Sequence, residues 1–292
     1  MTGREAMPIE RSPTAEQSIP AYVADYQVQR VLGHGNNGRI FLARPPQRLG
    51  LAEEFVAVKA LHGPCHDAVY ERAVEELRAI SALDSPFLAK VFEAGLERTS
   101  FFYAMDYIVF GSLAAPGRPL SQTEVLLAVS HAASAAHALH EAGIAHTAIK
   151  PQNVLIGTRC ALLSDVGLGR YLQPGLTTTG VATAGAVEYV DPIVLRGGAP
   201  SRSSDVWALG ATLHRALTGV GLYGELPANA PLLAIRRVMS GNLILAQHLS
   251  PDFADLIRDC LASPDQRIPT AAAVAHRLTD LARGGGSQVS GE

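Results

Sequence analysis

Long apolar runs are missing from this sequence of 292 residues. No uncharged apolar stretch reaches the roughly 18 residues that a membrane-spanning helix needs. The start, MTGREAMPIERSPTAEQ, carries acids and prolines where a secretory signal would have an apolar core. The sequence therefore predicts a cytoplasmic protein with no membrane span in this chain.

Cysteine and net charge are also scarce. The three cysteines, Cys65, Cys160 and Cys260, are odd in number and far apart, which argues against a disulfide framework and favours free thiols in a reducing compartment. A net charge of −3 creates no overall field that would attract nucleic acid or an anionic membrane. We therefore expect no nucleic-acid partner.

What is present is a globular composition with polar ends. Residues 1–22 and 284–292 are rich in polar side chains, with prolines in the first segment and glycines in the second, and are predicted to be flexible tails. Between them, residues 23–283 form one predicted domain with two lobes, about 23–108 and 109–283.

The first lobe is patterned as a β-sheet with one helix. Val74, Leu77 and Ile80 form an apolar stripe with helical spacing over residues 68–83. Strands are predicted at residues 26–33, 39–44, 53–61, 89–95 and 100–108. One helix on a small antiparallel sheet indicates an α+β unit.

The second lobe is predicted to be helical. Its first helix opens with a capping box of Ser121 and Glu124 and ends at Gly143. Further helices, bounded mostly by serine, proline or glycine, are predicted at residues 201–219, 230–241, 250–263 and 270–282.

Three glycines in the GxGxxG spacing, Gly33, Gly35 and Gly38, follow the first long strand. Glycine lets a backbone approach phosphates closely, because no Cβ intervenes. A strand at residues 39–44 follows the glycines, whereas a dinucleotide-binding fold would place a helix there. The pattern favours a hairpin flap over phosphates, with an ordinary tight hairpin as the alternative.

Lys59 ends the apolar segment VAVK on a predicted strand. A lysine among apolar residues is costly to bury unless it is paired. The helix that follows offers Glu75 and Glu76 as partners, although either acid alone reads equally well as a solvated helix charge.

Five further motifs occur in a fixed order: HTAIKPQNVLI from His146, then SDVGLG, VEYVDPI, SSDVWALG and SPDQRIPTA. With the glycine flap and VAVK, they resemble the motifs of bacterial eukaryotic-like Ser/Thr protein kinases, among them HRDLKPxNILI, DFG, PEYMAPE and SDVWSLG, over about residues 24–281. The resemblance implies a bilobal protein-kinase-like fold of the α+β class, with a β-rich N-terminal lobe and an α-helical C-terminal lobe.

The resemblance also implies a site for ATP and Mg²⁺. Lys59 would hold the α- and β-phosphates and pair with Glu76. Asn153 and Asp165 would supply oxygen ligands for Mg²⁺, and Lys150 would reach the γ-phosphate. The implied adenine contacts are the Asp106 carbonyl, the Ile108 amide, the gatekeeper Met105 and the flanking Ile40, Ala57 and Leu155.

The catalytic loop departs from the family pattern. Ala148 stands where working kinases have the aspartate that takes or orients the substrate hydroxyl proton, and a positioned base is worth roughly 10²–10⁴-fold in rate. Ala186 stands at the threonine that contacts that aspartate. Thr147 replaces the arginine that receives an activation-loop phosphate, so Thr177–Thr179 are either a target of another kinase or a plain polar loop.

Two further departures concern packing. Val166 replaces the phenylalanine of a stack that joins the lobes, whose other members would be Ile80, Val91 and His146. We therefore expect a gap at Val166 or a closer approach of the lobes.

Ile193 replaces the glutamate that pairs with the family arginine, here Arg267. Because an unpaired buried charge is costly, we expect Asp191 or a shifted loop to take the place of that glutamate.

The sequence thus favours a catalytically inactive kinase homologue, or pseudokinase, that acts as a nucleotide-responsive signalling or scaffolding module. Its expected partners are proteins, such as an active kinase or its substrate. The first alternative is a weak or unconventional ATP-dependent Ser/Thr kinase or transferase. The second is a scaffold that binds no nucleotide.

Two groups of histidines offer other interpretations. His62, Cys65 and His66 have the residue types of a zinc site, but a fourth ligand is not evident, so zinc is disfavoured. The histidines of the helix after Ser121 are interpreted as structural, namely His131, His137 and His140.

Overall fold

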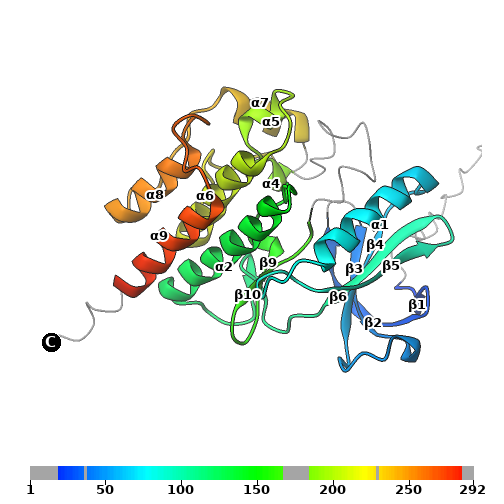
Figure 1. The fold of residues 1–292 in the computed structure, drawn as a ribbon. Coiled ribbons are helices and arrows are strands. Elements are labelled where there is room, and N and C mark those ends of the chain that lie inside the picture. Colours follow the sequence, from blue (N-terminus) through cyan, green and yellow to red (C-terminus); the bar gives the residue numbers. More distant parts are fainter. Residues whose placement is uncertain (1–18, 36–37, 167–183, 228–229, 285–292) are drawn as a thin grey trace, which may run out of the picture.

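Two lobes of different make-up lie side by side in the computed structural model, which describes residues 19–35, 38–166, 184–227 and 230–284. The first lobe is a β-sheet with one long helix, and the second is mostly helical (Figure 1). Within these residues, no helix is both long enough and apolar enough to cross a membrane. The predicted bilobal α+β fold is confirmed.

The first lobe is built on a six-stranded antiparallel sheet with the order β1-β2-β3-β4-β6-β5. Its strands are β1 (Tyr22–Val23), β2 (Tyr26–Gly35), β3 (Gly38–Arg44), β4 (Val56–Leu61), β5 (Val91–Glu97) and β6 (Ser100–Asp106), with a short 3-10 turn, η2 (Gln47–Leu49), before β4. All five predicted strands are present. β4 begins at Val56 rather than at residue 53, since the exposed Glu53 and Glu54 precede the ladder.

Helix α1 (Asp67–Ser81) packs against one face of this sheet. It buries Leu77 and Ile80 as the apolar stripe predicts. Successive side chains of a strand point to opposite faces, so Phe101, Tyr103 and Met105 of β6 share the face under α1. The sheet therefore presents a packed row of side chains beneath the helix.

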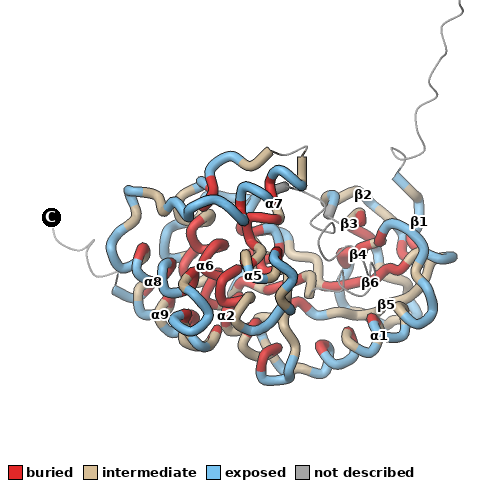
Figure 2. Tube along the Cα trace, turned by 90° about the horizontal axis from the view of Figure 1, so that it is seen from above, coloured by how far each residue is buried: buried red, intermediate tan, exposed pale blue. Residues whose placement is uncertain are grey.

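The second lobe is a helical body around α2 and α6. Its helices are α2 (Gln122–Glu141), α4 (Ala184–Val187), α5 (Pro192–Leu195), α6 (Arg202–Thr218), α7 (Pro231–Ser240), α8 (Pro251–Leu261) and α9 (Ala271–Gly284). The predicted capping box of α2 is formed, with the Ser121 hydroxyl accepting the Glu124 N–H and the Glu124 carboxylate accepting the Ser121 N–H. Buried segments of α2 and α6 mark the core of this lobe (Figure 2).

A small sheet, ordered β10-β9-β7-β8, lies where the lobes meet. Its strands are β7 (Gly111–Ser112), β8 (Ala115–Pro116), β9 (Val154–Ile156) and β10 (Ala161–Leu163), and the turn η3 (Pro151–Asn153) leads into β9. The Leu163 N–H donates to the Phe87 carbonyl at 2.7 Å, and the Ala89 N–H donates to the Leu163 carbonyl at 3.0 Å. These bonds hold the end of β10 against the first lobe.

A buried ion pair anchors α5 to the loop before α9. Arg267 Nη1 lies 2.6 Å from Asp191 Oδ2 and also donates to the Ser203 carbonyl at 2.8 Å. Both charged side chains are almost fully buried. The expectation that Asp191 would replace the missing glutamate is confirmed, and Ile193 is partly exposed.

Candidate functional site

Lys59 and Asp165 face each other across the junction of the lobes. Lys59 is buried on β4, and its Nζ lies 2.5 Å from both Oδ1 and Oδ2 of Asp165. Asp165 follows β10 with a left-handed backbone, φ 67°. Burial alone would raise the pKa of Asp165, but the charge and hydrogen bonds of Lys59 outweigh burial and hold that pKa below its ordinary value. The Asp165 carboxyl group is therefore ionised.

The partner of Lys59 corrects one expectation. Between described residues, the ion pair of Lys59 is made with Asp165 and not with Glu76. Glu76 is half-buried on α1, whereas Glu75 is exposed. The carboxylate that neutralises the buried lysine comes from the second lobe.

Tyr103 is a site residue that the sequence reasoning missed. Its hydroxyl donates a short hydrogen bond to Asp165 Oδ1, and its backbone pairs with that of Lys59 between β6 and β4. Burial and the negative charge of Asp165 raise the pKa of Tyr103 well above its ordinary value, so it stays a donor. The period-two pattern of β6, which places Tyr103 two residues before Met105 on one face, carried a signal of this position.

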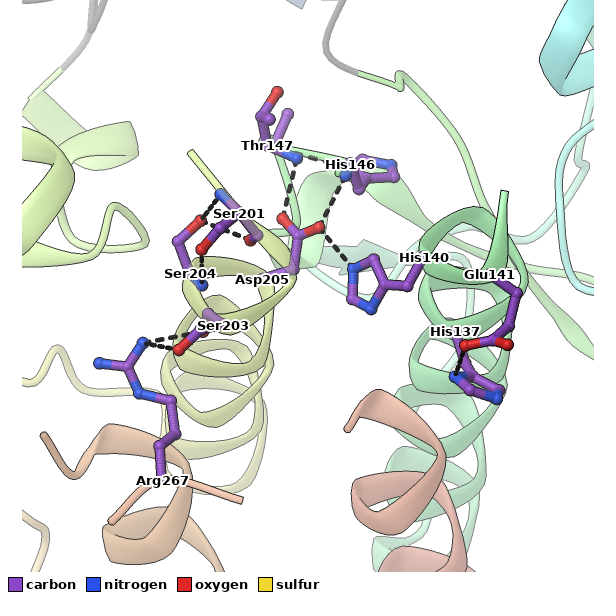
Figure 3. Close-up of polar contacts among 11 residues, drawn as sticks. His137, His140, Glu141, His146, Thr147, Ser201, Ser203, Ser204, Asp205 and Arg267 are labelled. Atoms are coloured by element: carbon purple, nitrogen blue, oxygen red, sulfur yellow. Dashed lines mark hydrogen bonds and ion pairs between the residues drawn. The ribbon is translucent and has the colours of Figure 1, made fainter. Parts of the chain in front are cut away.

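Asp205 holds the loop after α2 in place through hydrogen bonds. Its Oδ2 accepts the His146 N–H at 2.6 Å and lies 2.9 Å from His140 Nε2, while its Oδ1 accepts the Thr147 N–H at 2.8 Å (Figure 3). Asp205 lies in the first turn of α6, inside the segment SSDVWALG. This one carboxylate fixes the backbone on which Ala148 sits.

His146 links this loop to the segment that carries Asp165. Its Nε2 lies 3.1 Å from the Ser164 carbonyl oxygen, and its Nδ1 accepts the Ala148 N–H at 3.2 Å. Burial lowers the pKa of His146, and the neutral ring with its proton on Nε2 satisfies both contacts. The positions of residues 146–148 and 164–165 are thus coupled.

The remaining polar residues of the predicted site are Asn153 and Lys150. Asn153 Nδ2 donates to the Ala148 carbonyl at 2.8 Å. The amide nitrogen of Asn153 is used in this bond, and its amide oxygen points away from that carbonyl. Burial lowers the pKa of Lys150, while the charge of Asp165 opposes that effect. An amide oxygen and a carboxylate are ligands that Mg²⁺ accepts, so Asn153 and Asp165 fit the predicted metal role by donor type.

The glycines of the flap differ in what a side chain at their position would meet. A Cβ at Gly38 would collide with the Ala60 carbonyl on β4, so packing alone demands glycine there. A Cβ at Gly33 would meet nothing within 4 Å, and Gly33 has no left-handed φ. Space over Gly33 is what a closely approaching ligand would use. Gly35 ends β2 and pairs with Gly38.

Three of the predicted adenine residues lie on neighbouring strands of the first sheet. Ile40 pairs with Lys59, and Ala57 pairs with Met105, so β3, β4 and β6 present them together. Leu155 lies in the second lobe, where it pairs with Ser112 in the small sheet. Beyond β6, Ile108 lies outside the ladder, and the Asp106 side chain accepts the Lys90 N–H at 2.8 Å.

A small cavity lies behind the Lys59–Asp165 pair. It has room for about one water molecule and is lined by Leu77, Ile80, Ala89, Val91, Tyr103, Met105, Leu163, Ser164, Asp165 and Val166. It lies at the predicted lobe-joining stack, of which Ile80, Val91 and Val166 are members. The expected gap beside the small valine is confirmed.

Both groups of histidines lie in the described part of the chain. Among the described residues, which include His62, Cys65 and His66, no group of three metal-binding side chains is present. His131 Nδ1 accepts the Ala161 N–H at 3.2 Å, and His140 Nε2 lies 2.9 Å from Asp205 Oδ2. Both histidines therefore have structural roles. Gly167 and Thr177–Thr179 lie outside the described residues.

Known proteins share this architecture. The model of the protein kinase domain matches residues 26–279. The serine/threonine-protein kinase PknJ of Mycobacterium tuberculosis is 31% identical over 268 residues, which cover 88% of this chain and 43% of PknJ. PknK of the same organism is 35% identical over 175 residues, which cover 59% of this chain and 16% of PknK. This chain therefore corresponds to less than half the length of either relative.

A solved structure supports the fold independently. The crystal structure of the PknI kinase domain of Mycobacterium tuberculosis, a cysteine-to-alanine mutant, superposes with a TM-score of 0.64 and 22% identity. The match covers 91% of this chain and 100% of the PknI chain. Seven motifs in order, two lobes with the expected topology and a family match over most of the length lead to one conclusion. The chain belongs to the protein kinase domain family.

Proposed function

We propose that this chain is a pseudokinase that binds a nucleotide between its lobes and does not transfer phosphate. The observation that supports this is the contrast at one site. Lys59 and Asp165 form an ion pair and Asn153 is retained, which are the residue types of a phosphate and metal site, while Ala148 and Ala186 put methyl groups where a working kinase has the base and its partner.

The residues present account for binding. Lys59 from the first lobe and Lys150 from the second are two cations whose charges both act on Asp165. Asn153 and Asp165 would hold Mg²⁺, which would neutralise part of the phosphate charge when bound. A nucleotide held this way contacts both lobes and reduces their relative freedom.

The same geometry accounts for the loss of chemistry. The N–H groups of His146 and Thr147 are bonded to Asp205, so the loop keeps its place without a catalytic role for residue 148. A methyl group at Ala148 neither accepts nor orients the proton of a substrate hydroxyl. Signalling would then depend on shape, with a protein partner such as an active kinase or its substrate reading whether the lobes are held together.

Nucleotide binding is tested by thermal unfolding with and without ATP and Mg²⁺, for the wild type and Lys59→Met. A ligand that binds only the folded state stabilises it by RT ln(1 + [L]/Kd). We expect the melting temperature to rise in the wild type and not in the variant. An unchanged melting temperature up to millimolar ATP would contradict nucleotide binding and favour a scaffold without nucleotide.

Phosphate transfer is tested with γ-labelled ATP on the protein itself and on a generic substrate protein. We expect no label from the wild type and none from Asp165→Ala. Transfer that depends on Asp165 would overturn the proposal. The double variant Ala148→Asp with Ala186→Thr restores the two missing groups, and a gain of transfer in it alone would locate the defect.

One observation supports a second candidate, a weak or unconventional kinase or transferase. Lys150, Asn153 and Asp165 are all retained, and phosphoryl transfer depends mostly on positioning and charge. This candidate requires slow ATP turnover that disappears in Lys59→Met. Equal background rates in both proteins would exclude it.

A further inference from the structure

The acceptor capacity of the Asp165 carboxylate is nearly used within the protein. Its two oxygens have about four lone-pair sites. Lys59 Nζ occupies one on each oxygen at 2.5 Å, and the Tyr103 hydroxyl takes a further site on Oδ1. Within the described residues, Oδ1 is thus held by two donors and Oδ2 by one.

Tyr103 is fixed in this position by its surroundings. It lies on β6 directly opposite Lys59, it is 3% exposed, and its ring lies beneath α1 with Phe101 and Met105. A buried hydroxyl needs a partner, and Asp165 supplies it. If Asp165 turned fully toward a metal ion, the Tyr103 hydroxyl would be left buried without this acceptor.

A magnesium ion must compete with these donors for the carboxylate. Mg²⁺ demands near-octahedral oxygen ligands and takes few protein carboxylates. Hydrogen bonds to a charged group are stronger than neutral ones, and displacing one commonly costs on the order of tenfold in an equilibrium. The Tyr103 hydroxyl therefore opposes metal binding at Asp165 while it holds the carboxylate in place beside Lys59.

We propose that Tyr103 is a positioning residue that holds Asp165 on Lys59 and makes nucleotide binding largely independent of Mg²⁺. This inference deepens the proposed function and rests on it. The nucleotide phosphates are held chiefly by the two lysines, and the added metal contributes little affinity.

The test compares ATP affinity by calorimetry in excess Mg²⁺ and in excess EDTA, for the wild type and Tyr103→Phe. For the wild type we expect the two affinities to agree within about threefold. For Tyr103→Phe we expect Mg²⁺ to raise the affinity on the order of tenfold or more, because the carboxylate has lost one competing donor. A strong Mg²⁺ dependence in the wild type, or the same ratio in both proteins, would overturn the proposal.

A matched control comes from the first lobe. Tyr26 is fully buried in a different hydrophobic cluster from Tyr103, and its hydroxyl donates to Glu93 Oε2 at 2.6 Å. Tyr26→Phe removes the same kind of bond, so it controls for general loosening of the lobe. The ratio of affinities in Tyr26→Phe should equal that of the wild type, and a tenfold rise there as well would assign the effect to loosening.

A second measurement needs no nucleotide, so it separates this proposal from the proposed function. Unfolding of the wild type, Tyr103→Phe, Asp165→Ala and the double variant forms a thermodynamic cycle. We expect non-additivity on the order of tenfold in the unfolding equilibrium constant; additive effects would overturn the contact itself. If Asp165→Ala fails to fold, Asp165→Asn replaces it. Coupling without any ATP binding in EDTA or Mg²⁺ would instead overturn the proposed nucleotide function and this inference with it.

Discussion

Asp205 accepts the N–H of Thr147 at 2.8 Å while Thr147 adopts a left-handed backbone with φ 64°. A β-branched residue is strained in that region, because its side chain crowds the following carbonyl. The loop in front of Ala148 is thus held in a costly conformation by a carboxylate at its base.

The strain at Thr147 gives a stability prediction. Thr147→Asn should raise the free energy of unfolding by about 0.5–1 kcal/mol, because asparagine tolerates the left-handed region better. Urea unfolding measures the change. Thr147→Val keeps the branched Cβ and should not stabilise. Equal effects of the two substitutions would show that backbone strain is not the cause.

Removing the Asp205 carboxylate should be far more damaging. Asp205→Ala leaves the His146 and Thr147 N–H groups and the His140 ring without their acceptor, and we expect a loss of about 3 kcal/mol or more. Asp255→Ala is the matched control, because its ion pair with Arg258 is exposed on both sides and is expected to contribute less than about 1 kcal/mol. Denaturant unfolding measures the loss of unfolding free energy in both variants. Losses of similar size would contradict this role of Asp205.

His214 predicts a pH dependence of stability. Its Nε2 accepts the Ala246 N–H at 3.1 Å, and burial lowers its pKa to about 4 from an ordinary value of 6.5. Between those values the unfolded chain binds a proton that the folded chain does not, so stability falls as the pH drops from 6.5 toward 4. The slope from one such group approaches about 1.4 kcal/mol per pH unit.

Urea unfolding at several pH values between 4.5 and 7.5 measures this slope. His214→Gln should flatten it, because the neutral side chain can still accept from the Ala246 N–H. His276→Gln, at an exposed histidine, serves as the control and should leave the slope unchanged. An unaltered slope in His214→Gln would assign the acid sensitivity to other groups.

The two glycines of the flap predict opposite kinds of defect. Gly33→Ala should leave the melting temperature nearly unchanged and weaken ATP binding by about tenfold, because its Cβ meets only the space a ligand would use. Gly38→Ala should lower the free energy of unfolding by about 1–3 kcal/mol, because its Cβ collides with the β4 backbone. Thermal unfolding and calorimetry separate the two. A destabilised Gly33→Ala protein with normal affinity would contradict the assignment.

The sequence predicted the elements of the fold because their signals are local. Period-two strands, the stripe with Leu77 and Ile80, and the Ser121 capping box each depend on residues a few positions apart. The replacement of a missing glutamate by Asp191 was also accessible, since an arginine that must be buried needs a nearby carboxylate.

The sequence did not reveal the choice of partner inside the site. Glu76 and Asp165 are both carboxylates that a kinase fold brings near Lys59, and only the arrangement of the lobes decides which one pairs with it. The bond from Tyr103 to Asp165 spans 62 residues and depends on the same arrangement. Neither of these two contacts can be predicted from a local sequence pattern.

Asp191 performs two tasks at once. One oxygen pairs with Arg267, and the other accepts the Ile193 N–H that begins α5. The short helix therefore cannot unravel without disturbing the buried pair, and the loop before α9 cannot detach while that helix persists. Amide hydrogens on both segments should exchange together as a single cooperative unit, although the two segments are more than 70 residues apart in the chain.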